Sequence, residues 1–441
     1  MSALTETAPG GAASTAGAPA ARRLSDIEAS FAWTHALLRG TTQVTTHVTV
    51  RGDVDPARLR AAVRRWAAAL PILSLRIEER PDGLWFRPEP GAPHPPVRTG
   101  VLDPGTTSDD VLREELNDVL ETGGPLWRLR LVHDPRAGSA HLYFTRNHAI
   151  SDGHSTGAVV RTLLDLLYGP GEGQGSPYDV GRPAPNADEL PYLPPAAGPA
   201  AQPDGQEEPA AARPAPLPFA DHRPWRERGT DVVPLAFTAG ESLALRTWCK
   251  EHGTTVNQFF AAALAASFAQ VTGRTEISLY TAVSLRRRYA PHTPLPDVGC
   301  YISVLAVPLR PGGDDPARQA RAYATALARA DAAWRPPRRD HAEIRRTVGD
   351  LAGARSSPGI CLTNVGVVDP ALGPHAGRVT GFRTVVNRTG ANYGTVLHLG
   401  TLHGAFSAAL AFGTPSTDPE TVRGVAKALR DRVLHPGRAA P

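Results

Sequence analysis

Residues 140–169 constrain the fold of this chain more than any other stretch. Up to Asn147 the side chains alternate in a run of aromatic and β-branched residues, which predicts a strand. Beyond Ser155 apolar residues recur at three- and four-residue intervals, which predicts a helix; they are Val159, Val160, Leu163, Leu164 and Leu167. A strand that passes into a helix through a polar turn requires a fold that mixes both elements, and it gathers reactive side chains at one strand end.

The turn itself, residues 147–155, is open to several interpretations. The first takes His148 as a general base, because an imidazole titrates near neutrality and can accept a proton from an alcohol or amine that attacks a thioester. Asp152 and Gly153 complete the pattern His-x-x-x-Asp-Gly. Gly153 has no Cβ, so a narrow substrate arm could pass close to the backbone there.

A second interpretation takes Gly153 to Gly157 as a Gly-x-Ser-x-Gly nucleophile elbow with Ser155 as the nucleophile. An elbow strand runs directly into its first glycine, whereas residues 147–152 intervene here, and no His-Gly-Gly oxyanion loop lies upstream. A third takes His148, Asp152 and His154 as metal ligands, although their spacing fits no common ligand pattern. A fourth gives the turn no chemistry, with a structural histidine beside an N-capping residue. The turn alone leaves these alternatives open.

Composition limits the class of protein. The chain has 441 residues, of which 41% are hydrophobic, and this length favours two domains with substantial cores. A net charge of +4, with arginines spread along the chain, argues against nucleic acid as a partner. Three distant cysteines, Cys249, Cys300 and Cys361, indicate reduced thiols rather than disulfides or a zinc site.

The sequence carries no pattern typical of export or membrane insertion. Residues 1–23 have neither a basic start nor an apolar core, so we expect no signal peptide. The longest apolar run, 259–271, is too short to span a bilayer and predicts a buried helix. We therefore expect a soluble, cytoplasmic protein without a membrane partner.

Two low-complexity segments indicate how the chain is divided. Residues 1–20 form an Ala/Gly/Thr/Pro tail that has little to bury, so we expect it to be disordered. Residues 170–216 are dense in Pro, Gly and Ala and predict a crossover linker. A structureless segment of that length is unusual inside one domain, so the predicted lobes are 21–169 and 217–441.

Both lobes mix strands and helices without a regular βαβ repeat, which indicates an α+β fold of mixed sheets with flanking helices. In the first lobe we expect a helix from Pro56, a helix capped by Ser108, and strands at 42–50, 73–79, 84–87 and 127–132. In the second we expect helices ending near Trp248 and at 256–272, 316–334 and 419–434, with strands at 232–237, 276–283, 302–309, 360–368, 395–402 and 406–412.

Several segments accompany the central turn in a fixed order. They are VDPARLRAAVRRWAAALPILSLRI, GPLWRLRLV, RNHAISDGHS, TTVNQFFAAALAASFAQVTG followed by ISLYTAVSLRRRY, VGCYISVLAVPL and GICLTNVGVVD. From about residue 24 to about residue 434, this order resembles the condensation-like, CoA-dependent acyltransferase superfamily. The superfamily includes chloramphenicol acetyltransferase, nonribosomal peptide condensation domains, plant-type alcohol acyltransferases and polyketide-associated mycobacterial (phthiocerol-type) acyltransferases. The resemblance implies two chloramphenicol-acetyltransferase-like lobes in a V-shaped pseudo-dimer with a central tunnel.

The resemblance also assigns roles to residues of the motif. His148 matches the catalytic base, and Asn147 replaces the first histidine of the family's His-His-x-x-x-Asp-Gly motif. Asp152 matches an aspartate that points away from substrate and pairs with an arginine, for which Arg286 is the first candidate and Arg287 the second.

Further assignments concern the tunnel. Gly153 would line the channel for the pantetheine arm, and Ser155 would only start a helix. The other tunnel-lining residues that the resemblance implies are Asn147, Ser303, Asn364 and Gly366.

The implied activity is direct transfer of an acyl group from an acyl-CoA or a phosphopantetheinyl acyl carrier protein to a hydroxyl, or to an amine, of a secondary metabolite. The segments DGHS and TNVG most resemble the polyketide-associated, ester-forming branch. No cofactor or metal is expected beyond the thioester co-substrate, and a monomer is expected. Two alternatives stay open: a non-catalytic scaffold that binds carrier proteins, and a serine hydrolase or acyltransferase that uses Ser155.

Overall fold

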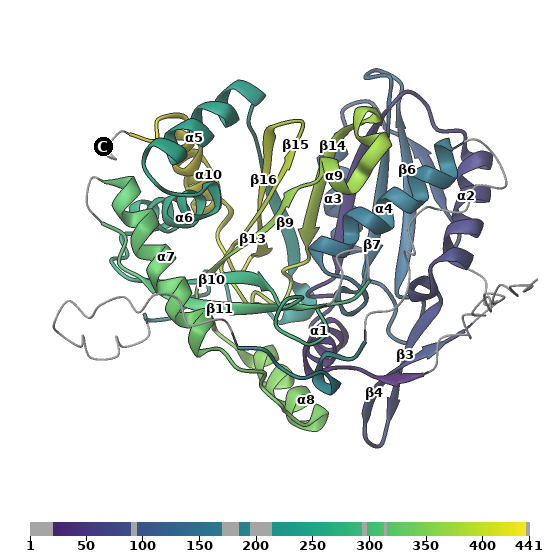
Figure 1. Ribbon diagram of the computed structural model, residues 1–441, viewed down its shortest axis with the longest axis horizontal. Helices are drawn as coiled ribbons and strands as arrows, with labels where there is room; N and C mark the ends of the chain where they lie inside the picture. The colour runs from purple at the N-terminus through teal and green to yellow at the C-terminus, as the bar shows by residue number, and fades with distance from the viewer. Residues whose placement is uncertain are drawn as a thin grey trace, which may run out of the picture.

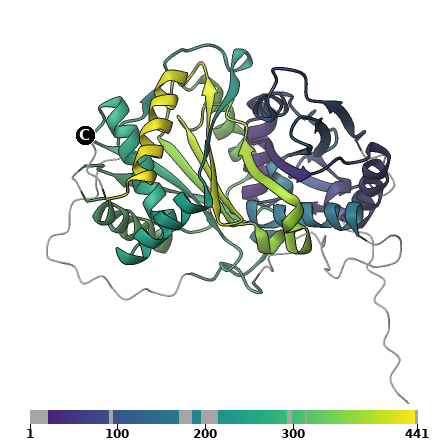
Figure 2. The ribbon, with the colours of Figure 1, turned by 90° about the horizontal axis from the view of Figure 1, so that it is seen from above.

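The computed structural model describes residues 21–89, 95–169, 185–194, 214–292, 298–312 and 315–437. The predicted tail at 1–20 and most of the predicted linker at 170–216 lie outside these residues, so both stay predictions. The described chain forms two halves that lie side by side (Figures 1 and 2), each with a sheet and its own helices. This arrangement confirms the predicted two-lobed α+β fold.

The sheet of the N-terminal half has five strands in the order β14-β2-β7-β6-β5. All neighbours are antiparallel except β5 and β6. The strands are β2 (Val44–Arg51), β5 (Arg98–Val101), β6 (Trp127–Asp134), β7 (Ser139–Arg146) and β14 (Val379–Val386). The edge strand β14 comes from the far end of the sequence, so the two halves share a sheet.

Four helices surround this sheet: α1 (Asp26–Leu37), α2 (Pro56–Ala69), α3 (Ser108–Asn117) and α4 (Gly153–Tyr168). The predicted apolar face of α2 is buried, and its Trp66 Nε1 donates to the Val159 carbonyl oxygen of α4 at 3.0 Å. Beside them, β1 (Arg22–Arg23), β3 (Leu75–Arg80) and β4 (Gly83–Pro88) form a small antiparallel sheet. The motif helix α4 is therefore fixed against a packed core.

The sheet of the C-terminal half has six strands in the order β11-β10-β13-β15-β16-β9. They are β9 (Gly229–Ala236), β10 (Ile277–Ser284), β11 (Ile302–Leu309), β13 (Ile360–Val367), β15 (Val396–Leu402) and β16 (Ala405–Thr414). Its outer face is covered by α5 (Ala239–Glu251), α6 (Val256–Thr272), α7 (Pro316–Ala333) and α10 (Pro419–Leu434), as Figure 1 shows. Ten consecutive residues of α6, 259–268, are buried, as expected for a central helix.

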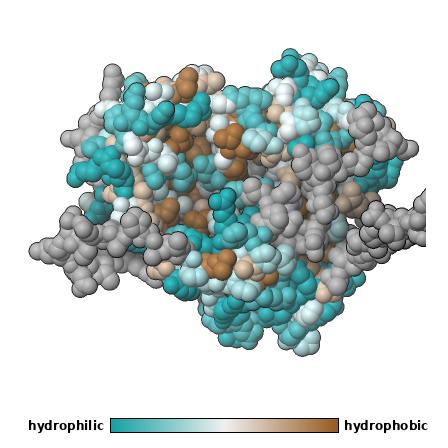
Figure 3. All heavy atoms as spheres, viewed as in Figure 1, coloured by the Kyte–Doolittle hydropathy of each residue, from teal (hydrophilic) through white to brown (hydrophobic). Residues whose placement is uncertain are grey.

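Shorter elements also come from the second part of the sequence: β8 (Leu217–Pro218), β12 (Ser356–Ser357), α8 (His341–Asp350) and α9 (Asp369–Leu372). Of these, α8 packs against α1 and α9 packs against α4, so both helices lie on the N-terminal half. On the face shown in Figure 3, visible apolar residues gather toward the line between the halves, and the outer rims are polar. In the part of the chain that the structure describes, no helix is long and apolar enough to cross a lipid bilayer.

The predicted cap of α3 is wrong by one residue. Thr107, not Ser108, is the N-cap, because its side chain accepts the Asp110 N–H at 3.2 Å. The Asp110 carboxylate accepts the Thr107 backbone N–H in return at 2.8 Å. This reciprocal capping box satisfies two N–H groups at once, whereas Ser108 is the first residue inside the helix.

Candidate active site between the two halves

The central turn links β7 to α4 as the sequence predicts. β7 ends at Arg146, a single 3₁₀ turn follows at His148–Ile150, and α4 begins at Gly153. Asn147 caps the 3₁₀ turn by accepting the Ala149 N–H at 3.0 Å, and Asp152 caps α4. Two caps in six residues fix the turn, and His148 begins its 3₁₀ helix.

His148 is held in a buried and defined position. Its side chain is 9% exposed, and its ring stacks on Phe31 of α1 with centroids 4.3 Å apart. Nδ1 lies 3.7 Å from Cys300 Sγ, and within the described residues Nε2 has no hydrogen-bond partner. Burial, and next the positive charge of Arg146, lower the pKa of His148 from 6.5 to about 4. The imidazole is therefore neutral at pH 7 and can accept a proton.

Two cavities meet at His148. The larger has a volume of about 410 Å³, and the smaller about 60 Å³. Both are lined by residues from the two halves, and they share five of them: His148, Ala282, Ile302, Thr363 and Val386. His148 therefore lies where two cavities meet, and each cavity could hold one of two reactants.

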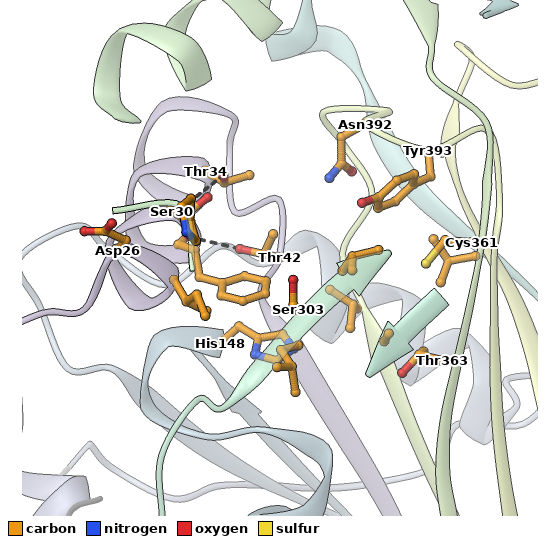
Figure 4. Close-up of a pocket in the computed structure, with 18 of the residues that line it drawn as sticks. Asp26, Ser30, Thr34, Thr42, His148, Ser303, Cys361, Thr363, Asn392 and Tyr393 are labelled. Carbon is orange, nitrogen blue, oxygen red and sulfur yellow. Dashed lines mark hydrogen bonds between the residues drawn. The ribbon is translucent and has the colours of Figure 1, made fainter. Parts of the chain in front are cut away.

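The larger cavity contains the predicted tunnel residue Ser303, which Figure 4 shows beside His148. The smaller cavity contains Gly153 and Asn364. A Cβ on Gly153 would lie 3.0 Å from Val365 Cγ1, so glycine allows the start of α4 to approach β13 closely. The structure thus places these predicted residues around one histidine.

Two residues that we expected in the tunnel lie elsewhere. Among the described lining residues of these two cavities neither Asn147 nor Gly366 occurs. The Asn147 side chain caps the 3₁₀ turn, and the residue lines a separate cavity of about 240 Å³ that is also lined by Trp33 and Leu126. Gly366 has a φ of +77° and accommodates a bulge in β13, where its N–H is bound by Asn364 Oδ1 at 2.8 Å.

Asp152 pairs with Arg286, as the resemblance implies. Arg286 Nε donates to Asp152 Oδ2 at 3.0 Å, and Nη2 donates to Oδ1 at 3.2 Å. The carboxylate also accepts the backbone N–H groups of Ser155 and Tyr301, at 2.9 Å and 3.3 Å. Both charged side chains are at most 2% exposed, and neither lines a cavity at His148. This ion pair fastens α4 to the C-terminal half.

The geometry does not support a nucleophile elbow at Ser155. Its hydroxyl is fully buried and donates to Asp152 Oδ1 at 3.0 Å. An activated serine needs a base within hydrogen-bond reach of Oγ, and of the described residues no histidine bonds to it. As for the metal interpretation, the described residues contain no group of three or more His, Cys, Asp and Glu side chains that could hold an ion.

Sequence reasoning missed four polar residues around the cavities. Arg146 is fully buried and donates hydrogen bonds to hydroxyl oxygens, including Thr46 Oγ1 at 2.9 Å. His398 of β15 lines the smaller cavity, and its buried Nε2 has no partner among the described residues. Arg388 and Tyr393 lie between β14 and β15 and line the larger cavity. The only available signal was their polar character inside or between apolar strands.

Solved structures of known proteins show the same fold over nearly the whole chain. The trichothecene 15-O-acetyltransferase of Fusarium sporotrichioides superimposes with a TM-score of 0.69 at 12% identity, over 94% of this chain and 95% of that one. The first condensation domain of the calcium-dependent antibiotic synthetase, in complex with a substrate analogue, gives 0.68 at 15%, over 96% and 98%. Polyketide synthase associated protein 5 from Mycobacterium tuberculosis gives 0.59 at 16%, over 93% and 97%.

The chain therefore has the fold that these acetyltransferase and condensation-domain structures share, which confirms the fold that the resemblance implies. Within it, residues 227–398 match the family model described as the phthiocerol/phthiodiolone dimycocerosyl transferase C-terminus. One curated relative, the nonribosomal peptide synthetase ecdA of Aspergillus rugulosus, is 32% identical over 114 residues, or 26% of this chain. The matched segment spans only 2% of that synthetase.

Proposed function

We propose that this protein transfers an acyl group from a thioester to a small-molecule hydroxyl, or to an amine, with His148 as the general base. The observation that carries the proposal is the position of His148 at the junction of two cavities with Nε2 free of described protein partners. A base in this position can reach an acceptor in one cavity and a thioester in the other.

The reaction follows as direct transfer. The acceptor oxygen or nitrogen attacks the thioester carbonyl carbon while Nε2 of His148 takes its proton. The carbon–sulfur bond then breaks, and the imidazolium returns the proton to the departing thiolate. Asp152 takes no part, since its carboxylate is already engaged by Arg286 and two backbone N–H groups.

The smaller cavity is assigned to the thioester arm and the larger one to the acceptor. The first assignment follows the resemblance, which puts Gly153 beside the pantetheine arm, and Gly153 lines the smaller cavity. We propose acyl-CoA or a phosphopantetheinyl carrier protein as the donor, with no further cofactor. The carrier-protein alternative draws support from the likeness to a condensation domain of a peptide synthetase.

The test compares two substitutions in the central turn. His148→Ala should fold normally and slow thiol release from acyl-CoA donors, in the presence of an alcohol acceptor panel, by about 10²- to 10⁴-fold. Ser155→Ala should keep most activity and lose about 1 kcal/mol of stability at most, because it removes only a hydroxyl at a helix start.

The contrary outcomes identify the alternatives. A folded but inactive Ser155→Ala protein, or an acyl adduct on Ser155 in mass spectra, would establish a covalent serine mechanism instead. Equal thiol release by wild type and His148→Ala for every donor would favour the non-catalytic scaffold that binds carrier proteins.

A further inference from the structure

The larger cavity contains a buried arginine that the proposed mechanism does not use. Arg388 follows β14, is 7% exposed and lines the cavity together with His148. Its guanidinium makes one hydrogen bond to the described residues, from Nη1 to Asn392 Oδ1 at 3.3 Å, and its Nε has no partner there. Within the described chain no carboxylate pairs with it, unlike Arg286 or Arg128.

A guanidinium in this setting is costly for the folded protein. Arginine stays protonated in proteins, and burial of a charge without a counter-ion is destabilising. The groups nearest to Arg388 in charge interaction are the neutral thiol of Cys361 and the neutral phenol of Tyr393, whose pKa values burial raises. Nothing described around Arg388 supplies the missing negative charge.

The rest of the cavity has the same charge bias. Arg335 and Arg339 also line it, and the one acidic lining residue among those described, Asp26, already accepts the Arg339 backbone N–H. Figure 4 shows Asp26 on the side opposite Asn392 and Tyr393. Most of the remaining polar lining residues carry neutral hydroxyl groups, including Ser30, Thr34 and Ser303. A space of about 410 Å³ with this lining suits a small, hydroxylated, anionic molecule.

We propose that the larger cavity recognises the acyl acceptor by a carboxylate that binds Arg388, so that the acceptor is a hydroxy acid or an amino acid. That the bound molecule is the acyl acceptor rests on the proposed function, whereas the anion site itself does not. Arg388 and His148 line the same cavity, so a molecule bound to the guanidinium lies in the space that the imidazole also faces. The phosphates of CoA are separated from the thioester by the whole pantetheine arm, and therefore cannot be the anion that Arg388 meets.

The experiment measures binding rather than turnover. Melting temperatures are recorded with increasing concentrations of matched acids and primary amides: lactate and lactamide, mandelate and mandelamide, salicylate and salicylamide. A ligand that binds only the folded state raises the melting temperature by an amount that grows with the logarithm of its concentration relative to Kd. For at least one pair, the acid should raise the melting temperature of wild type in this concentration-dependent way and the amide should not.

Two variants locate the effect. Arg388→Met should weaken acid binding by about 10- to 100-fold, the worth of a charged hydrogen bond. Without ligand it should melt at or above the wild-type temperature, because it removes a buried charge that has no carboxylate partner. The control Arg423→Met, at a half-exposed arginine of α10, should bind as wild type does.

Several results would overturn the proposal. They are equal binding of acids and amides, no rise with any acid, an acid preference that survives in Arg388→Met, and a clearly lower melting temperature of Arg388→Met. The enzyme could instead prefer malonyl-CoA to acetyl-CoA in a way that depends on Arg388, without any preference for the free acids. Arg388 would then bind a carboxylate of the acyl group, and this result would also overturn the proposal. Acid binding without any thiol release would instead contradict only the proposed function.

Discussion

At the scale of single residues, the environment of His148 determines how the protein responds to pH. Burial and the charge of Arg146 lower the pKa of His148 to about 4, against 6.5 for an unfolded chain. The acid limb of kcat/KM should therefore fall near pH 4, and activity should be constant from about pH 5.5 to 7. An acid limb near pH 6.5 would contradict this environment.

The same shift affects stability, with a definite sign. Because the pKa of His148 is lower in the folded protein, the neutral imidazole makes its full contribution to the free energy of unfolding above about pH 6.5. This contribution is lost as the pH falls toward 4. The difference is on the order of 3 kcal/mol. The melting temperature of wild type should fall over this pH range more steeply than that of His148→Gln.

The sequence predicts site residues well where they are close together in the chain or belong to the resembled motif. His148, Asp152 and Gly153 fall within six residues, and Arg286 follows from the motif of the second half. Arg388 could not be predicted, because its burial depends on a cavity whose walls come from both halves. A polar residue at a strand end is more often exposed, and only the assembled fold reverses that expectation.

At the scale of elements, the Asp152–Arg286 pair should act as a fastener rather than as a catalyst. Asp152→Asn keeps an oxygen for the Ser155 N–H but leaves the buried guanidinium without its carboxylate, a loss of about 3–5 kcal/mol. We expect a clearly lower melting temperature together with lower activity. The control Asp418→Asn alters another N-cap aspartate, at exposed sites of α10, and should change stability by less than about 1 kcal/mol. An inactive Asp152→Asn protein with unchanged melting would give Asp152 a chemical role.

Elements with one clear periodicity were predicted closely. The bounds of α6, β11 and α10 agree with the predicted 256–272, 302–309 and 419–434. By contrast α1 and β14 were not predicted. The buried residues of α1 lie on several of its sides, so its sequence shows little amphipathic pattern. Its start does carry a local signal, because Ser25 and Glu28 form a capping box. β14 carries Gly381 and pairs with a strand more than 300 residues earlier, which no local pattern indicates.

At the scale of the whole molecule, strand β14 in the N-terminal sheet and the buried Asp152–Arg286 ion pair are two of the connections between the halves. Residues 176–214 carry almost no apolar periodicity and are predicted to be the preferred protease site. Limited digestion should first cut there. The two fragments should still elute together and unfold in one transition, because β14 of one fragment completes the sheet of the other.

Two outcomes would contradict this expectation. First cleavage elsewhere, with 176–214 intact, would count against the predicted division of the chain. Fragments that separate under native conditions would mean that seven paired positions between β14 and β2 contribute little to cohesion.

The shared sheet also has a consequence for synthesis. A growing chain makes β2, β6 and β7 early, but the partner of β2 at the sheet edge ends only at Val386. Until that point leaves the ribosome, the backbone N–H and C=O groups along one side of β2 have no strand to bind, and such an edge is a template for intermolecular pairing. Synthesis must therefore have passed Val386 before the first half of the protein can complete its sheet.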